Sequence, residues 1–201
     1  MVVCINIYMT TYNYQYAFPV AIEYDPAQLI TLFEENKSKG NLATLRLVVS
    51  EHPCLQALQQ CYNWLGDYVD FFTTYPGIGY PIHIDNTFID RKVVLNIPLI
   101  NSAKSYTSWY NIPDTAEWTQ SDPSTANKTN EGVYASTGKF LKAASIVAPL
   151  VPLYTLETLE PVVINTKVPH DVKNKSGLIR VIASWHLRFD NYAAAKDTLN
   201  V

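Results

Sequence analysis

Short runs of β-branched and aromatic residues, separated by turn signals, make up most of the chain from Asp67 onward. Runs of this length and composition are typical of β-strands, and PGIG at 76–79 and NKSG at 174–177 indicate turns between them. A succession of short strands favours antiparallel pairing in a sandwich or jelly roll. The strands are expected near 67–75, 80–86, 92–100, 104–111, 150–156, 160–166 and 177–188. Charged residues are only 16% of the chain and aromatic residues 12%, which also favours a β-dominated core.

The first 66 residues follow a different pattern. Asp25 is a suitable N-cap, Pro26 occupies the first helical position, and Gly40 follows a basic last turn, which together indicate a helix. Apolar residues recur every three or four positions in a second stretch, as in an amphipathic helix. This region is expected to hold strands at 2–8 and 43–50 and helices at 25–40 and 52–66.

The chain is interpreted as a single domain, 1–201, because its length suits one hydrophobic core. Residues 1–66 would support a jelly-roll core at 67–190. The polar, Ser/Thr-rich stretch 113–131 interrupts the strand pattern and is expected to be a mobile loop or a lid. Residues 133–148 fit either a strand or a helix, and 191–201 fit a short helix.

Composition argues against several classes of partner. The net charge of -3 and the isoelectric point near 5.8 provide no basic surface for nucleic acid. The three cysteines lack paired spacing, so neither a disulfide framework nor a zinc site is expected. No apolar run approaches the roughly 18 residues that a membrane-spanning helix needs. A cytoplasmic protein with reduced thiols is the expectation.

A possible metal site begins at His83 and Asp85. Residues two apart on a strand project from the same face, although an exposed polar pair near a turn is the simpler interpretation of these two alone. His170 follows 85 residues after Asp85, and Arg180 follows ten residues later. Two imidazoles and one carboxylate form the facial triad that binds non-haem Fe(II) and leaves coordination positions open.

This pattern resembles the 2-oxoglutarate- and Fe(II)-dependent oxygenases, and in particular their prolyl-hydroxylase-like members. The segment TTYPGIGYPIHIDN is similar to the strand, turn and metal strand of that family, VVLNIPLIN to its next core strand, and EPVVINTKVPHDV to the strand and loop that deliver the distal histidine. The similar stretches cover roughly 67–110 and 150–190. The resemblance implies a mainly β fold, a double-stranded β-helix of jelly-roll type supported by N-terminal helices.

The resemblance also implies roles for individual residues. His83, Asp85 and His170 would bind iron and form the catalytic centre. Arg180 would hold the distal carboxylate of 2-oxoglutarate, which suits its permanently charged guanidinium, and Tyr75 would contact the same cosubstrate.

The chain departs from the family after Arg180. Many members have Ser two residues later, where this chain has Ile182. Strand alternation places Ser184 on the same face as Arg180, so Ser184 is the candidate replacement. The alternative for Arg180 is an internal salt bridge to one of the chain's own carboxylates.

The activity implied is that of an Fe(II)- and 2-oxoglutarate-dependent dioxygenase, a hydroxylase of a C–H bond in a protein side chain or a small molecule. The residues do not identify the substrate. Two other classes stay open. A cupin-like metal protein would use the same ligands without 2-oxoglutarate, and a non-catalytic jelly-roll module for binding or structure would hold no metal.

Overall fold

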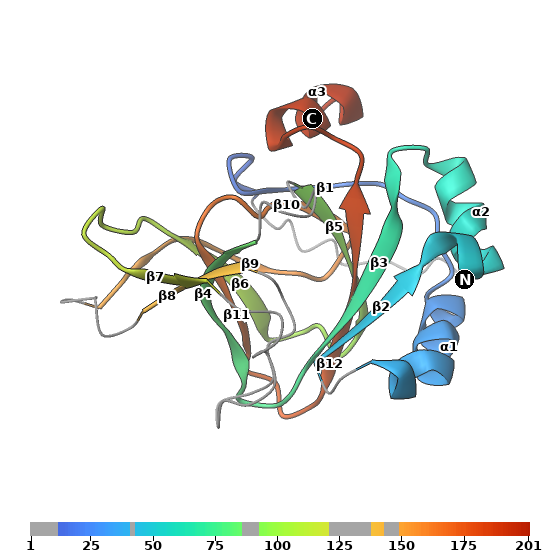
Figure 1. Ribbon diagram of the computed structural model, residues 1–201, viewed down its shortest axis with the longest axis horizontal. Helices are drawn as coiled ribbons and strands as arrows, with labels where there is room; N and C mark the ends of the chain where they lie inside the picture. Colours follow the sequence, from blue (N-terminus) through green and yellow to red (C-terminus); the bar gives the residue numbers. More distant parts are fainter. Residues whose placement is uncertain (1–11, 41–42, 86–92, 121–137, 143–148) are drawn as a thin grey trace, which may run out of the picture.

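Two six-stranded antiparallel sheets form the body of the computed structural model, which describes residues 12–40, 43–85, 93–120, 138–142 and 149–201 (Figure 1). Sheet A contains, in spatial order, β1 (Ala17–Pro19), β10 (Val162–Asn165), β5 (Val93–Ile100), β12 (Arg180–Leu187), β3 (Leu65–Thr74) and β2 (Thr44–Val48). Sheet B contains β7 (Trp118–Gln120), β8 (Gly138–Leu141), β4 (Gly79–Asp85), β11 (His170–Asn174), β6 (Ser105–Tyr110) and β9 (Pro152–Glu157).

The chain crosses repeatedly from one sheet to the other. Strands β3, β4, β5 and β6 lie in sheets A, B, A and B, and β9, β10, β11 and β12 lie in B, A, B and A. Successive strands therefore wind around a common interior, with four in sheet A (order β10-β5-β12-β3) and four in sheet B (order β4-β11-β6-β9). This arrangement is a double-stranded β-helix, so the predicted fold class is confirmed.

Most predicted elements are present with small shifts at their ends, but β1 and β11 were not predicted, and β8 (Gly138–Leu141) is a strand within the ambiguous stretch 133–148. Residues 170–174 form β11, whereas the sequence indicated only a loop that delivers His170. Within the predicted loop or lid at 113–131, Trp118–Gln120 form a strand. The remainder of that segment, and the strand expected at 2–8, lie outside the described residues.

In the described part of the chain, the sheets are accompanied by the α-helices α1 (Pro26–Asn36), α2 (Pro53–Cys61) and α3 (Tyr192–Leu199) and by two short 3-10 helices, Lys37–Lys39 and Val49–Glu51. Asp25 caps α1 as predicted, because its Oδ1 accepts hydrogen bonds from the backbone N–H of Ala27 at 2.9 Å and of Gln28 at 3.3 Å. Helices α1 and α2 lie on the side of sheet A that faces away from sheet B (Figure 1). Among the described residues, no helix has the length and apolar character needed to cross a bilayer.

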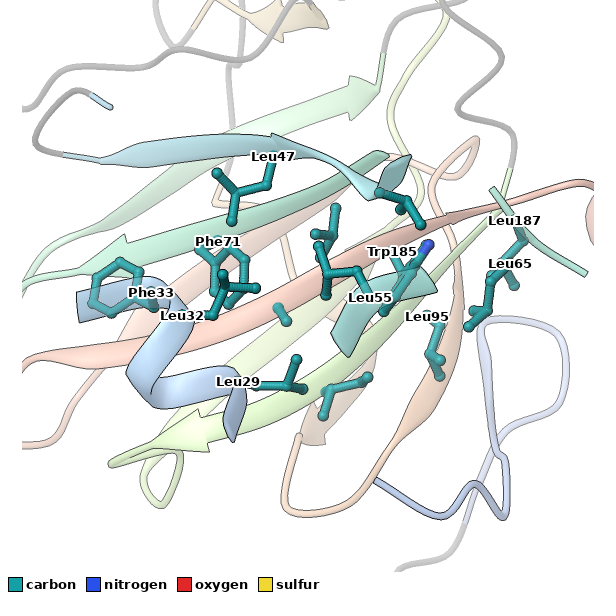
Figure 2. Close-up of a cluster of buried hydrophobic side chains, with 14 of the residues drawn as sticks. Leu29, Leu32, Phe33, Leu47, Leu55, Leu65, Phe71, Leu95, Trp185 and Leu187 are labelled. Carbon is teal, nitrogen blue, oxygen red and sulfur yellow. The ribbon is translucent and has the colours of Figure 1, made fainter. Parts of the chain in front are cut away.

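The largest hydrophobic cluster lies between these two helices and sheet A (Figure 2). Leu29 of α1 and Leu55 of α2 are fully buried in it, together with Phe71 and Trp185 from the sheet. The rings of Phe33 and Phe71 stack at 5.7 Å between centroids. One face of sheet A is therefore a dry core, and its other face is left to line the interior between the sheets.

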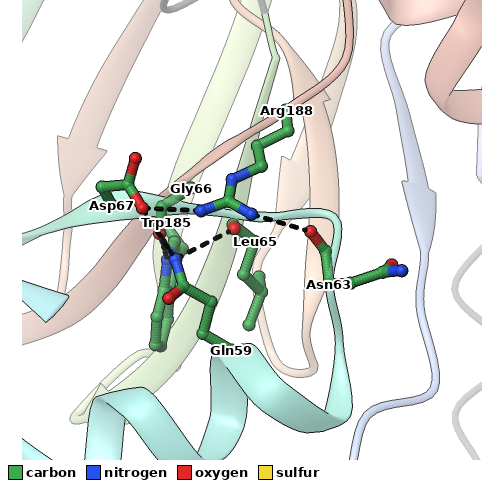
Figure 3. A network of polar contacts seen from close by, with 7 residues as sticks. All are labelled: Gln59, Asn63, Leu65, Gly66, Asp67, Trp185 and Arg188. Atoms are coloured by element: carbon green, nitrogen blue, oxygen red, sulfur yellow. Dashed lines mark hydrogen bonds and ion pairs between the residues drawn. The ribbon is translucent and has the colours of Figure 1, made fainter. Parts of the chain in front are cut away.

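A polar network joins α2 to the start of β3 and the end of β12 (Figure 3). Gln59 Nε2 donates to the Gly66 carbonyl at 2.9 Å and to Asp67 Oδ1 at 3.0 Å. Arg188 Nη2 donates to the same Asp67 oxygen at 2.6 Å, and Trp185 Nε1 donates to the Gly66 carbonyl at 2.8 Å. A Cβ on residue 66 would lie 2.8 Å from the His186 carbonyl oxygen, so this close approach requires glycine.

Candidate metal centre

The winding of the chain places the candidate residues at two ends of the interior. Strand β4 ends at Asp85 and the antiparallel strand β11 begins at His170, so both residues lie at one end, here called the metal end. Strand β11 then runs away from that end, and the chain turns back into β12, which begins at Arg180. Arg180 therefore starts from the opposite end of the interior and from the other sheet.

His83, Asp85 and His170 converge at the metal end. His83 and His170 are directly paired across the β4–β11 ladder, and their ring centroids are 4.3 Å apart. His83 Nε2 lies 3.5 Å from Asp85 Oδ1, and one ligand atom from each of the three residues lies within 4.8 Å of the others. Metal–ligand bonds of about 2.0 to 2.2 Å place ligand atoms roughly 3.0 to 3.5 Å apart, so a modest side-chain movement would complete the site.

Backbone carbonyls fix the orientation of both imidazoles. His83 Nδ1 lies 2.7 Å from the carbonyl oxygen of Pro81, and His170 Nδ1 lies 2.9 Å from that of Val168. A carbonyl only accepts, so each Nδ1 carries the proton and Nε2 is the nitrogen available to a metal. Such hydrogen bonds are the usual outer support of metal-binding histidines.

The side chains of His83, Asp85 and His170 shift one another's pKa values. Burial acts to lower the pKa of His83, but the hydrogen bond and charge of Asp85 outweigh it and raise that pKa. Burial acts to raise the pKa of Asp85, and the hydrogen bond and charge of His83 reverse this and lower it. Burial and then the charge of His83 lower the pKa of His170 to about 4. The Asp85 carboxylate therefore favours positive charge beside it, which a bound divalent cation would also provide.

A β-bulge in β4 determines which residues share the face of His83. The pairing with β11 runs from His83 opposite His170 to Tyr80 opposite Val172, so β4 contains one extra residue. Pro81 lies within this bulge, where its missing N–H costs no ladder hydrogen bond. Tyr80 consequently lies on the same face as His83, with ring centroids 6.2 Å apart.

A cavity of about 50 Å³ lies between the sheets and contains most of the predicted site. It is lined by five of the six predicted residues: His83, Asp85, His170, Arg180 and Ser184. Ile182 lines it too, as strand alternation predicts. The remaining lining residues are Phe72, Tyr80, Val94, Asn96, Ile164 and Val172.

Tyr75 does not line this cavity, which corrects its predicted position. It lines a separate pocket together with Thr73 and Ile179. Strand β3 ends at Thr74, and residues 73 and 75 face away from the interior that Phe72 lines. Tyr80 is the tyrosine that faces the metal residues, and the sequence signal for it was Pro81, since proline inside a strand indicates a bulge that changes the alternation.

Arg180 is buried without a counter-charge in the described part of the chain. Its side chain is 1% exposed, and its Nε has no hydrogen-bond partner. Burial lowers its pKa to about 10, and the nearby Tyr80 acts in the opposite direction. The alternative of an internal salt bridge is not found among the described residues. A buried guanidinium that faces a cavity favours an anionic ligand, because an unpaired buried charge is costly.

Asn96 was not among the predicted site residues. It is 4% exposed and lines the cavity, yet its Oδ1 has no hydrogen-bond partner. The available signal was a single amide within the apolar run VVLNIPLI. A polar side chain at the centre of a buried strand requires either a partner in the protein or a ligand.

Two other buried acids near the site have partners within the protein, although Asp171 Oδ1 has no hydrogen-bond partner among the described residues. His186 Nε2 lies 3.2 Å from Asp70 Oδ2, and Asp70 also binds Arg46 through both carboxylate oxygens, at 2.7 and 2.9 Å. Asp171, next to His170, accepts from Tyr110 at 2.9 Å and pairs with Lys173 at 2.7 Å. Neither acid orients a candidate metal ligand, because both histidines are held by backbone carbonyls.

Comparisons with known proteins found similar structures but no similar sequence. No family model and no curated protein matches the chain. Among solved structures, the non-heme alpha-ketoglutarate-dependent carbocyclase SnoK from nogalamycin biosynthesis is 12% identical, with a TM-score of 0.47, over 85% of this chain and 79% of that one. A Pseudomonas putida prolyl-4-hydroxylase is 15% identical, with a TM-score of 0.40, over 81% and 80%.

A third similar structure is EvdO2 from Micromonospora carbonacea var. aurantiaca, which is 13% identical, with a TM-score of 0.43, over 85% of each chain. These TM-scores are all below 0.5, so the fold assignment depends on the strand order rather than on these scores. By that strand order, the chain has a double-stranded β-helix fold.

Proposed function

We propose that the protein is an Fe(II)- and 2-oxoglutarate-dependent dioxygenase that hydroxylates a C–H bond. One observation carries the proposal: a two-histidine, one-carboxylate cluster and a buried, unpaired Arg180 line the same cavity. The cluster alone is compatible with several metal chemistries. The arginine adds a requirement for an anion that reaches from the metal end toward the opposite end of the interior.

The donor set suits ferrous iron. His83 and His170 would bind through Nε2 and Asp85 through its carboxylate, and three protein ligands leave coordination positions for other molecules. When bound, iron supplies the means to split dioxygen, so that 2-oxoglutarate, dioxygen and R–H become succinate, carbon dioxide and R–OH. One oxygen atom enters succinate and the other enters the product.

The chain's own residues would orient the cosubstrate. A dicarboxylic 2-oxo acid has a chelating end for the metal site and a distal carboxylate that Arg180 can bind by charge-assisted hydrogen bonds. Phe72, Val94 and Ile182 provide apolar walls between these two ends, which keeps water away from the arginine and strengthens its attraction for the carboxylate. The substrate is proposed to be a small molecule or a peptide side chain.

The two alternative functions explain less of the structure. A metal protein that does not use 2-oxoglutarate gives no reason for a cavity-facing Arg180 without a partner among the described residues. A module without metal gives no reason for two buried imidazoles, each held through Nδ1 by a backbone carbonyl, that converge with a carboxylate. The first alternative leaves the arginine end of the cavity unexplained, and the second leaves the metal end unexplained.

Anaerobic titration with Fe(II) and then 2-oxoglutarate tests the proposal. Chelation of ferrous iron by the 2-oxo acid gives a weak visible charge-transfer band, which we expect in the wild type. His170→Ala should lose the band. Arg180→Met should need more 2-oxoglutarate to produce it, and Arg188→Met, which changes an exposed arginine, should match the wild type. Bound iron without a band would favour a metal protein that does not use 2-oxoglutarate, and no bound iron would favour the module without metal.

A further inference from the structure

A pocket of about 410 Å³, here called the outer pocket, lies on the opposite side of sheet A from the interior cavity. Residues from the last turn of α1 and just beyond it line one wall, and residues at the end of sheet A where β12 begins line the other. Strand β2 begins at the same end of the sheet, after α1 (Figure 1). Of the residues predicted for the site, only Tyr75 lines this pocket, and the proposed function does not use it.

The floor of the outer pocket continues the main hydrophobic core. Phe33, Leu45 and Val181 line the pocket and belong to the cluster between the helices and sheet A, where each is at most 7% exposed. Ile100 packs against the same cluster. Figure 2 shows Phe33 at one end of that cluster. An apolar molecule in the pocket would therefore contact side chains that the core already holds in place, which favours binding.

Polar groups of the outer pocket come from strand ends. Thr73 and Tyr75, at the end of β3, contribute hydroxyls, which can donate or accept a hydrogen bond. Asn101 Nδ2 donates to the Ile179 carbonyl at 2.9 Å, which leaves the amide oxygen of Asn101 to accept. These groups would match a ligand with a hydroxyl or an amide at one end.

The charged residues of the outer pocket compensate each other. Lys37 Nζ forms an ion pair with the Glu34 carboxylate, and both side chains are about half exposed. In the described part of the chain, no other Asp, Glu, Lys or Arg lines this pocket. A charged ligand would give up part of its hydration without meeting an unmatched opposite charge. An uncharged ligand is therefore favoured.

The volume is also that of a small-molecule site. Such sites measure roughly 300–1,000 Å³ and are mostly apolar, with a few polar groups. We propose that the outer pocket binds an uncharged small molecule with an apolar body and a hydroxyl or amide group at one end. This inference does not depend on the proposed function. The ligand would contact Ile179 and Val181, the residues on either side of Arg180, from the face of the sheet opposite the interior cavity.

A second copy of the chain is the competing occupant. Ile78 and Leu178, on the turns next to Tyr75 and Ile179, are 42% and 58% exposed and would extend an apolar contact surface. A stable interface between two copies buries about 800 Å² of each one. Sedimentation of the wild type would detect such a dimer.

The experiment uses N-phenylnaphthylamine, an uncharged apolar probe with one N–H group whose fluorescence rises when it leaves water. Saturable binding is expected, and decanol should displace the probe. Decanoate and decylamine have the same apolar chain with a charge at one end. Each should compete roughly tenfold more weakly than decanol, because the pocket has no unmatched charge for them.

Two substitutions change the pocket itself. Thr73→Trp fills it from a strand position that suits aromatic residues, and should weaken probe binding roughly tenfold or more. Ile179→Asp adds an unmatched carboxylate and should reverse the preference from decanol to decylamine. Ile179 is 44% exposed, so this variant keeps the test valid if Thr73→Trp does not fold. Ile78→Asp is the matched control at an exposed isoleucine that does not line the pocket, and should bind as the wild type does.

Tyr75→Phe tests the polar end of the ligand. Loss of one neutral hydrogen bond should weaken decanol roughly 2- to 10-fold. Tyr14→Phe, at an exposed tyrosine outside the pocket, should change nothing.

Several results would overturn the inference. The first is absence of saturable probe binding to the wild type, and the second is binding that Thr73→Trp and Ile179→Asp both leave unchanged. Equal competition by decanol and decanoate would reject an uncharged ligand. A dimer that Ile179→Asp dissociates, without probe binding, would assign the pocket to a second copy. The assay contains neither Fe(II) nor 2-oxoglutarate, so none of these results bears on the proposed function.

Discussion

The two faces of β12 differ although every residue of the strand is buried. Trp185 and Leu187 belong to the face that packs under α1 and α2, where the indole N–H has a partner and the contacts are apolar. Arg180 and Ser184 belong to the face that lines the cavity, where Arg180 Nε has no partner. Burial alone therefore does not distinguish core from site. The distinction is whether the buried polar atoms are satisfied within the chain.

According to this comparison, the core face of β12 contributes to stability. Under the proposed function, its cavity face binds the ligand. Replacing a residue of the core face should change the free energy of unfolding. Replacing a residue of the cavity face should change ligand affinity and should have little effect on stability, or even improve it. Two substitutions on β12 test this division, and a third, at an exposed residue just beyond the strand, serves as a reference.

Trp185→Ala should give the largest effect. Trp185 is fully buried, and deleting a core tryptophan typically costs about 3–5 kcal/mol through lost burial and the cavity that remains. Chemical denaturation would measure the loss, and Trp185→Phe, which retains most of the packing, should cost less. A cost below about 1 kcal/mol for the alanine variant would break the division between the two faces.

Arg180→Met should lower the affinity for 2-oxoglutarate without lowering the stability of the protein. Methionine fills a similar volume without a charge, and replacing a buried charge with an apolar side chain is often neutral or stabilising. The free energy of unfolding of the ligand-free protein should therefore stay the same or rise, while 2-oxoglutarate affinity falls roughly 10- to 100-fold. A strong loss of stability would instead show that Arg180 has a structural partner.

Arg188→Ala should have the smallest effect and a defined pH dependence. The hydrogen bonds of Arg188 and then Gln59 lower the pKa of Asp67, against a weaker opposing effect of burial. A lowered folded-state pKa stabilises the fold above the unfolded-state value, near 3.9, and that contribution is lost as the pH falls through the folded-state pKa. Because the pair is exposed, the variant should lose less than about 1 kcal/mol at pH 7.

The comparison of denaturation midpoints at pH 7 and pH 3 checks this last prediction. The difference between Arg188→Ala and the wild type should shrink as the pH is lowered, because the lowered pKa of Asp67 stabilises the folded state only while that carboxyl is ionised. An equal difference at both values would mean that Arg188 acts through packing or through its hydrogen bond to the Asn63 carbonyl, rather than through the charge of Asp67.

Local sequence patterns predicted the parts of the site that depend on one strand. The alternation within β4 placed His83 and Asp85 together, and the alternation within β12 placed Ser184 with Arg180. The position of Tyr75 was inferred from the resemblance and not from alternation, and the bulge at Pro81 brings Tyr80 to the cavity instead. Strand β11 was missed because HDVKN contains few strand-forming residues. Tyr110 and Lys173 contact Oδ2 of its Asp171.

Local sequence patterns could not predict which residues of distant strands are paired. His83 meets His170 only through a ladder register set by the winding of the whole barrel. Whether a buried polar atom has a partner also depends on tertiary structure, so the unpaired atoms of Asn96 and Arg180 emerged only from the fold.

The three candidate metal ligands all belong to sheet B, whereas Arg180 belongs to sheet A. A bound metal ion alone would cross-link strands within one wall of the barrel. A 2-oxo acid bound to the metal at one end and to Arg180 at the other would connect sheet B to sheet A. The cosubstrate, and not the metal alone, would then oppose separation of the two sheets. Amide hydrogen exchange in β11 and β12 would then slow together on addition of 2-oxoglutarate, with a gain of about 2.7 kcal/mol in stability at a hundredfold excess over Kd.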